Sequence, residues 1–224
     1  MRNCYKGEYD RVISLGMDCR PKVIMDITGL SGKRTALDVV ATQQIDNLIY
    51  VLNNRFTDWF LESNLYTQPN SDKQYKRVRD IHTNYISVHD FSPESESISS
   101  EYPTFKRRLD KHADTLLKDI RNNDRVLFIL NLEMSPHERD TTDDLDTLTR
   151  QLPTLRQLLD QMCGNTNSHL FIATYHEPLQ SLHLSRTHIA IKQASWKTFM
   201  CGEELQTWQK WLDGVWLTQE DHSS

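Results

Sequence analysis

The feature that most constrains the fold is the stretch "RVLFILNL" (125–132), because it contains a continuous apolar run. A strand that is apolar on both faces must be covered on both sides, which is typical of the centre of a parallel sheet. Similar apolar runs occur in "RVISL" (11–15), "SHLFIATY" (168–175) and "THIAIKQ" (187–193). Longer segments with helical spacing of apolar residues separate them. We therefore predict an α/β fold with a layered, mostly parallel central sheet and helices on both faces.

The segments between these strands predict amphipathic helices. The first, "PKVIMDITGL" (21–30), has Pro21 in its first turn, where the missing N–H costs nothing. A serine- and glutamate-rich stretch (92–103) predicts an exposed loop, with Thr104 as the N-cap of the next helix. A further strand is expected in "NYISVHDF" (84–91). The remaining helices are expected at 45–65, 104–122, 143–163 and 202–216.

The composition limits the class of protein. The chain has 224 residues, a formal net charge of -5 and a pI of about 6.0, so we expect a single domain over 1–224. Nucleic acid is not expected as a partner, because the chain lacks a basic excess. No apolar run is long enough to insert into a membrane, and the polar start lacks a signal core, so a cytoplasmic location is expected. The cysteines form no C-x-x-C pair and are expected to be free thiols.

Polar residues follow the predicted strands at the point where each strand ends. In parallel sheets, ligands and catalytic groups gather beyond the carboxyl ends of the strands. The sequence therefore predicts one edge that collects cysteine, histidine, asparagine and acidic side chains. These are Cys19 after the first strand, His89 at the end of another, Asn131 and Glu133 after the third, and His176 and Glu177 after the fourth.

Cys19 is the strongest candidate nucleophile. Only the thiolate is a useful nucleophile, and a helix N-terminus lowers the pKa of a thiol through its unpaired N–H groups and its dipole. Cys19 lies just before Pro21 at the expected strand-to-helix turn, and Arg20 adds a positive charge. The N–H groups of such a turn could also bind a developing oxyanion. The alternative is that Cys19 packs as a small apolar residue, as free cysteines often do.

Thiol catalysis also requires a base, and the base requires a group that orients it. His89 is the leading candidate for the base. Asp90, Asp38 or Asn131 could orient the imidazole, and the sequence does not choose among them. The candidate catalytic residues are therefore Cys19, His89, Asp38 and Asp90.

Five quoted segments occur in an order that matches a known pattern: "ISLGMDC" (13–19), "NRFTDWFLESNL" (54–65), "YISVHDF" (85–91), "YPTFKRRLDKH" (102–112) and "RVLFILNL". In this order they resemble a bacterial family of papain-like cysteine peptidases, a domain of largely unknown function. The resemblance covers about residues 10–135 and leaves the last third of the chain unmatched.

The resemblance implies that Cys19 is the nucleophile and that His89 is its partner. It also implies a substrate connected with surface-glycan biosynthesis. One element departs from the family pattern, because the family's Phe-Asp-Trp element is "ALDVV" (36–40) in this chain. Asp38 is retained without its aromatic neighbours, which bears on substrate choice and on whether activity is retained.

Cationic side chains indicate where an anionic group of a substrate could bind. A basic run places Arg107 and Arg108 near a helix start, and Arg20 opens the first helix. We take Arg20, Arg107, Arg108 and Asn131 as candidate substrate-binding residues. The alternative for the basic run is a solvated helix face. Neither metal nor cofactor is predicted, because the histidines lack metal-ligand spacing and no glycine-rich phosphate loop is present.

The leading prediction is a cysteine hydrolase or acyltransferase that uses Cys19 and His89 on an unknown amide or ester. The alternative is a non-catalytic accessory protein that binds a glycan or a protein partner. A third prediction is an enzyme that binds a sugar phosphate or another anion through Arg20, Arg107 and Arg108. Geometry separates these hypotheses, because a hydrolase needs the thiol within reach of an imidazole in an open cleft. An accessory protein can bury the thiol, and the third hypothesis requires the arginines to converge.

Overall fold

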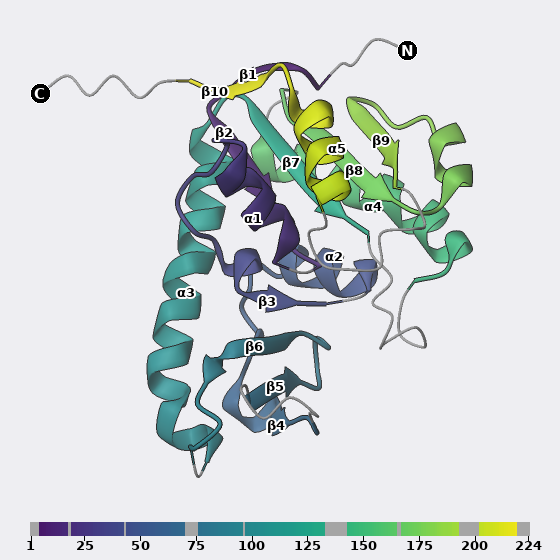
Figure 1. Cartoon of the computed structure of the whole chain (residues 1–224). Helices are drawn as coiled ribbons and strands as arrows, with labels where there is room; N and C mark the ends of the chain where they lie inside the picture. Colours follow the sequence, from purple (N-terminus) through teal and green to yellow (C-terminus); the bar gives the residue numbers. More distant parts are fainter. Residues whose placement is uncertain are drawn as a thin grey trace, which may run out of the picture.

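The computed structural model describes residues 5–17, 19–42, 44–69, 76–95, 97–132, 143–164, 167–192 and 202–218 (Figure 1). These residues form a mixed α/β structure, as predicted. A parallel sheet contains the four apolar runs identified in the sequence, and each neighbouring pair of its strands is parallel. Its order is β2 (Arg11–Ser14), β7 (Val126–Asn131), β8 (His169–Thr174) and β9 (Thr187–Ile191).

This sheet separates two apolar cores, because side chains alternate between its faces along each strand. Val126, Phe128 and Leu130 of β7 belong to one core, which also contains the apolar stripes of α2, α3 and α4. Leu127 and Ile129 of β7 belong to the other core, together with buried residues of α1 and α5. The helices are α1 (Arg20–Ile27), α2 (Ile45–Asn53), α3 (Ile98–Asn122), α4 (Leu145–Cys163) and α5 (Gly202–Leu212).

A second sheet is antiparallel, and it corrects the prediction of one mostly parallel sheet. Its order is β3 (Val40–Ala41), β6 (Ile86–Phe91), β5 (Lys76–Asp80) and β4 (Leu65–Thr67). The strand that carries His89 is therefore β6 of this sheet, and His89 does not lie at the edge of the parallel sheet. Short connections allow neighbouring strands to pair antiparallel, whereas a parallel pair needs a long crossover. The apolar pattern of 84–91 does not reveal which sheet the strand joins.

The second half of the serine-rich stretch is helical, which corrects the loop predicted at 92–103 for residues 98–103, whereas residues 92–95 are not helical. Helix α3 begins at Ile98 and includes Pro103, although Thr104 was expected to cap it. Tertiary contacts hold this polar first part of α3. The carboxylate of Glu101 accepts a hydrogen bond from the Ser92 N–H, and the Tyr102 hydroxyl donates to the Phe60 carbonyl at 3.2 Å.

The first and last strands of the described chain pair with each other. Strands β1 (Gly7–Tyr9) and β10 (Val215–Leu217) form a two-stranded parallel sheet. Helix α2 ends at Asn53, whereas the sequence predicted helical structure over 45–65. Apolar residues at helical spacing therefore continue in the sequence beyond the end of the helix. No helix in the described ranges is both long enough and apolar enough to cross a membrane. The 3-10 helices are η1 (Ala36–Asp38), η2 (Glu62–Asn64) and η4 (Glu177–Ser181).

Candidate active site

Cys19 is exposed and stands at the N-cap position of α1. Its carbonyl accepts a hydrogen bond from the Val23 N–H at 3.2 Å, and Pro21 occupies the first turn, as predicted. The Cys19 side chain makes no capping hydrogen bond. The thiol therefore lies at the positive end of the helix dipole without serving as the cap, a position that favours the thiolate.

The loop before Cys19 is held in one conformation by its own backbone and by η1. Gly16 has φ +74, and its N–H donates to the Ser14 hydroxyl at 3.1 Å. A Cβ on Gly16 would lie 2.9 Å from the carbonyl oxygen of Leu37, so only glycine fits this approach. The next residue, Met17, accepts a hydrogen bond from the Thr42 N–H at 3.3 Å. The turn that presents Cys19 is thus anchored to the segment 36–42.

Asp38 ends η1 within the same segment and is 7% exposed. Its Oδ2 accepts hydrogen bonds from the N–H and the hydroxyl of Thr35, at 2.7 and 3.1 Å. Its Oδ1 is buried and has no hydrogen-bond partner among the described residues. Burial raises the pKa of Asp38, and the two bonds from Thr35 and the positive charges of Lys22 and Arg34 oppose that rise. One carboxylate oxygen is therefore occupied by capping while the other is available to a further donor.

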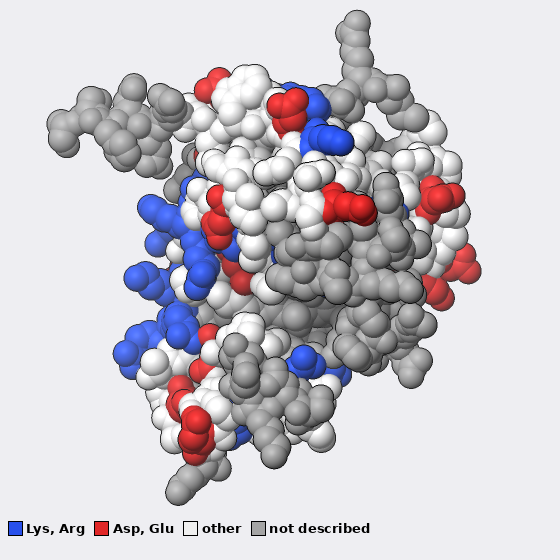
Figure 2. Space-filling model, viewed as in Figure 1, with Lys and Arg blue, Asp and Glu red and all other residues white. Residues whose placement is uncertain are grey.

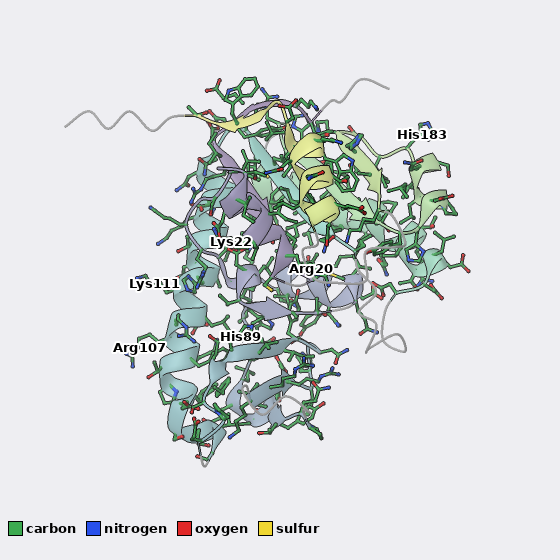
Figure 3. All side chains as sticks on the ribbon, in the orientation of Figure 1. Arg20, Lys22, His89, Arg107, Lys111 and His183 are labelled. Carbon is green, nitrogen blue, oxygen red and sulfur yellow. The ribbon has the colours of Figure 1, made fainter. Side chains whose placement is uncertain are left out.

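His89 is exposed on β6, which pairs with β3 directly after η1. The pairing matches Val40 with Ser87 and ends there, so Asp38 of η1 lies two residues before the paired part of β3 and His89 two residues after the paired part of β6. Figure 3 labels His89 on β6 and Arg20 at the start of α1, and Figure 1 shows β3 between these elements. Cys19 and His89 are thus both anchored to the segment 36–42, from its two sides.

A β-bulge on β6 determines how His89 is presented. Ser87 pairs with Val78 of β5 and Phe91 pairs with Lys76, so three β6 residues lie opposite one β5 residue. His89 is the central residue of these three. Bulges re-aim side chains and are common beside active sites. In the sequence, Val88 and Phe91 are three positions apart, which breaks the two-residue period of a regular strand at this point.

Asp90 is engaged by other groups. Its Oδ2 accepts a hydrogen bond from the Ser87 hydroxyl at 2.6 Å, and its Oδ1 forms an ion pair with Arg108 of α3. The Asp90 side chain is 11% exposed and the Arg108 side chain 47%. This pair ties α3 to β6. The Ser87 hydroxyl and Arg108 together occupy both oxygens of Asp90.

The other candidate cations lie on separate elements. Arg20 opens α1, and Arg107 is exposed on α3 with Lys111 one turn further along. Figure 2 shows Lys and Arg side chains gathered along the side of the molecule that α3 forms, and Figure 3 labels Arg107 and Lys111 there. Burial lowers the pKa of His112 on the same helix, and the charges of Arg34, Arg108 and Lys111 lower it further. This side of the molecule is therefore electropositive.

Asn131 is the last residue of β7 and is fully buried. Alternation along β7 directs its side chain to the face covered by α1 and α5, because Leu127 and Ile129 point there. Ser14 of β2 pairs with Ile129, and the Leu15 N–H donates to the Ile129 carbonyl at 2.9 Å, so the loop after β2 leaves the sheet beside this end of β7. Neither polar atom of the Asn131 side chain has a hydrogen-bond partner within the described ranges. A buried, unsatisfied amide thus lies next to the loop that leads to Cys19.

The sequence analysis missed Lys22, a buried cation in the first turn of α1. Lys22 is 8% exposed, and its ammonium donates to Asp26 Oδ1 at 2.8 Å, to Ser31 and to the Gly32 carbonyl. The spacing of four residues between Lys22 and Asp26 was the available signal.

The remaining predicted residues of the sheet edge follow β8 or lie outside the described residues. His176 precedes η4, which Glu177 begins, and the His176 N–H donates to the Thr174 hydroxyl at 3.1 Å. Glu133 lies outside the described residues. Within those ranges, no three His, Cys, Asp or Glu side chains are placed to hold a metal ion.

Comparison with protein-family models identifies one match, over residues 10–162, which is more than half of the chain. The family is described as "Putative papain-like cysteine peptidase (DUF1796)". This chain belongs to that family. The matched region contains Cys19, Asp38, His89 and Asn131, and it ends within α4. No curated protein and no solved structure matches the chain.

Proposed function

We propose that this chain is a cysteine hydrolase that cleaves an amide or ester bond with Cys19 as its nucleophile. The observation that carries the proposal is the exposed Cys19 thiol at the N-cap of α1. The membership of the chain in the papain-like peptidase family supports the same reading. Cys163 provides a contrast within the chain, because it is buried and burial raises the pKa of its thiol.

His89 is the proposed base and Asp38 the group that orients it. The pairing of β3, which follows Asp38 closely, with β6, which carries His89, supports this assignment, and so does the buried Oδ1 of Asp38, which has no donor among the described residues. Asp90 is the less suitable orienting residue, because Ser87 and Arg108 occupy its two oxygens. Catalytic hydrogen bonds often tighten only when substrate binds.

The proposed reaction has two steps. His89 removes the proton of the Cys19 thiol, the sulfur attacks the substrate carbonyl, and a thioester forms while the proton passes from His89 to the leaving group. His89 then removes a proton from water, which attacks the thioester and releases the acid and the free thiol. Backbone N–H groups at the start of α1 would stabilise the oxyanion in both steps. An alcohol or an amine in place of water would make the same site an acyltransferase.

The cations near the site suggest that part of the substrate is anionic. We assign Arg20 to this role, because it follows Cys19 directly, and Arg107 to a longer contact along α3. Arg108 is a weaker candidate, since Asp90 already holds it. A carboxylated or phosphorylated glycan has the required charge, and we propose a cytoplasmic location for such an enzyme.

The test is the pH dependence of Cys19 alkylation by iodoacetamide, followed by peptide mass spectrometry. In the wild type we expect Cys19 to react well below the unperturbed thiol pKa of about 8.5, while Cys163 in the same sample stays unmodified. In His89→Ala the low-pH reactivity of Cys19 should disappear. Reactivity of Cys19 that begins only near its unperturbed pKa, or is unchanged in His89→Ala, would refute the thiol–imidazole pair and favour an accessory protein.

A further inference from the structure

The segment that leads into η1 lies along helix α3. A Cβ on Gly32 would clash with the guanidinium of Arg11, and that guanidinium donates to Asp119 of α3 at 2.9 Å. Two residues after Gly32, the Arg34 carbonyl accepts a hydrogen bond from the ring of His112, which is also on α3. The segment therefore runs antiparallel to α3, from the turn of Asp119 back to the turn of His112.

Cationic side chains of this segment and of α3 meet at His112. The charges of Arg34 and Arg108 act on its imidazole, and so does the charge of Lys111. Arg107 lies one helical turn before Lys111, on the same side of α3 (Figure 3). Figure 2 shows Lys and Arg side chains gathered on this side of the molecule. Arg34, Arg107, Arg108 and Lys111 thus form a cationic cluster at this turn of α3.

Three members of the cationic cluster have no carboxylate partner, although several other cations of β2, α1 and α3 do. The ion pairs of these elements are Arg11–Asp119, Lys22–Asp26, Lys106–Asp110 and Arg108–Asp90. Arg34, Arg107 and Lys111 are exposed and form no ion pair within the described ranges. Asp114 follows Lys111 on the next turn of α3 and is not paired with it. Like charges that are held close together repel, so this place keeps an excess of positive charge that an anion would relieve.

The cationic cluster contacts both elements that hold the proposed base and its orienting group. Arg108 pairs with Asp90, which follows His89 on β6. On the other side, η1 packs against α3 and ends at Asp38. Burial raises the pKa of Asp38, and the charge of Arg34 is among those that oppose the rise. An anion bound by the cluster would therefore lie beside the proposed catalytic groups.

We propose that Arg34, Arg107 and Lys111 bind a phosphate group, and that this group belongs to the substrate of the proposed nucleophile. A phosphate monoester carries a charge of about −1.5 to −2 at neutral pH and has three strong acceptor oxygens, which suits three unpaired cations. A carboxylate, by contrast, is matched by a single guanidinium. The assignment to the substrate rests on the proposed function, whereas phosphate binding by the cluster does not depend on Cys19.

The first experiment measures phosphate binding without the thiol. The full chain with Cys19→Ser is titrated with sodium phosphate and, separately, with sodium chloride at the same ionic strength. Binding is followed by NMR of the histidine side chains, in which His112→Gln identifies the His112 signal. We expect a saturable shift of that signal with phosphate only. The bound anion should also raise the pKa of His112, because it stabilises the imidazolium.

Charge-matched variants test which cations bind the phosphate. Arg34→Gln keeps the carbonyl that holds His112, and Lys111→Gln keeps the helix, so each removes only a charged group. We expect each to raise the Kd for phosphate at least fivefold. Lys118→Gln removes the same charge from an exposed position of α3 outside the cluster and should leave the Kd unchanged. No saturable shift, or the same Kd in Lys111→Gln and Lys118→Gln, would overturn the phosphate site.

The second experiment asks whether the phosphate belongs to the substrate of Cys19. The wild type is treated with the N-iodoacetyl derivatives of aminoethyl phosphate and aminohexyl phosphate, each compared with the amino alcohol derivative that lacks the phosphate. Labelling of Cys19 is timed by mass spectrometry, with free cysteine as the reference thiol. With at least one spacer, we expect the phosphate to accelerate Cys19 labelling at least tenfold relative to free cysteine.

This acceleration should disappear in excess inorganic phosphate and in Lys111→Gln, and it should persist in Lys118→Gln. If neither spacer gives an acceleration while inorganic phosphate binds in the first experiment, the cluster binds a free phosphate and its assignment to the substrate is wrong.

The two proposals fail in different ways. If Cys19 is inert toward all four reagents while phosphate binding still depends on Lys111, the proposed hydrolase is wrong and the phosphate site stands. If Cys19 is reactive and inorganic phosphate does not bind, the phosphate site is wrong and the hydrolase stands.

Discussion

Asp143 caps helix α2 from across the chain: its Oδ2 accepts a hydrogen bond from the Ile45 N–H at 2.5 Å, although 98 residues separate the two. The N-cap residue Gln44 makes no side-chain capping bond of its own. Burial raises the pKa of Asp143 to about 6, the bond from Ile45 opposes the rise, and the charges of Asp46 and Asp144 add to it.

This raised pKa predicts a pH-dependent stability. Folding favours the protonated carboxyl, so the contribution of Asp143 is fully present below pH 3.8 and is lost as pH rises to about 6. Asp143→Asn keeps an acceptor for Ile45 without the charge. We therefore expect this variant to gain stability relative to the wild type as pH rises through that window. Asp143→Ala should lose about 0.5–2 kcal/mol, because the cap is removed.

Urea unfolding between pH 4 and 7 measures both effects. The quantity to compare is the difference in free energy of unfolding between variant and wild type at each pH. This difference is needed because His169 makes the stability of both proteins rise with pH in this range, opposite to the effect of Asp143. Burial lowers the pKa of His169 to about 4, helped by nearby arginines, so His169 destabilises the fold as pH falls below its unfolded pKa of 6.5. A difference between Asp143→Asn and the wild type that does not change with pH would contradict the raised pKa of Asp143.

Gly16→Ala tests whether the turn before Cys19 requires glycine. Gly16 has φ +74 and its Cβ would lie 2.9 Å from the Leu37 carbonyl, whereas Gly29 has φ +73 with nothing within 4 Å. Gly29→Ala should therefore lower the free energy of unfolding only through backbone strain, by about 1 kcal/mol. We expect Gly16→Ala to lose about 1–3 kcal/mol more, through overpacking. It should also slow Cys19 alkylation, which Gly29→Ala should not; equal losses of stability would show that the contact with Leu37 is unimportant.

Asp38→Asn and Asp90→Asn distinguish the two carboxylates that could orient His89. Asp38→Asn keeps an oxygen for the bonds from Thr35 and removes the negative charge. We expect it to slow Cys19 alkylation at neutral pH, because the imidazolium formed on His89 loses its stabilising partner. Asp90→Asn should weaken the ion pair with Arg108, at a cost of about 1 kcal/mol or less, and leave the alkylation rate unchanged. The opposite result for the two variants would assign the role to Asp90.

We expect Glu204→Gln to have an unusual effect on stability. Replacing a buried carboxylate that has a structural partner destabilises a protein, because the partner is left unpaired. A buried carboxylate without a partner itself costs free energy in the folded state, so its replacement removes that cost. Glu204 has no hydrogen-bond partner among the described residues, so the variant should be as stable as the wild type or more stable. Chemical unfolding of the two proteins measures this. A loss of more than about 1 kcal/mol would show that Glu204 supports the fold directly.

The local pattern of the sequence was enough to predict the strands that are covered by apolar side chains on both faces. The strands β2, β7, β8 and β9 are short apolar runs, and a strand covered on both faces must be apolar along its length. Pro21 and the residues before it mark the start of α1, because proline fits the first turn of a helix. Cys19 was placed at that start for the same reason.

Pairing and capping across the chain could not be predicted in this way. The strand of His89 joins an antiparallel sheet, and its bulge depends on its register with β5. The start of α3 was missed because Ser92 and Phe60 supply the contacts for its polar first turns. Neither partner is visible from the helix sequence.

The sequence by itself determined the class of fold, the strands of the parallel sheet and the position of Cys19 at a helix start, because these follow from hydrophobic alternation and backbone preference. Only the tertiary structure decided that the strand of His89 joins an antiparallel sheet beside β3 and that Asp90 pairs with Arg108. These relationships join residues far apart in the chain. They depend on how strands pair and how helices pack over the sheet, which the packing of the whole molecule determines.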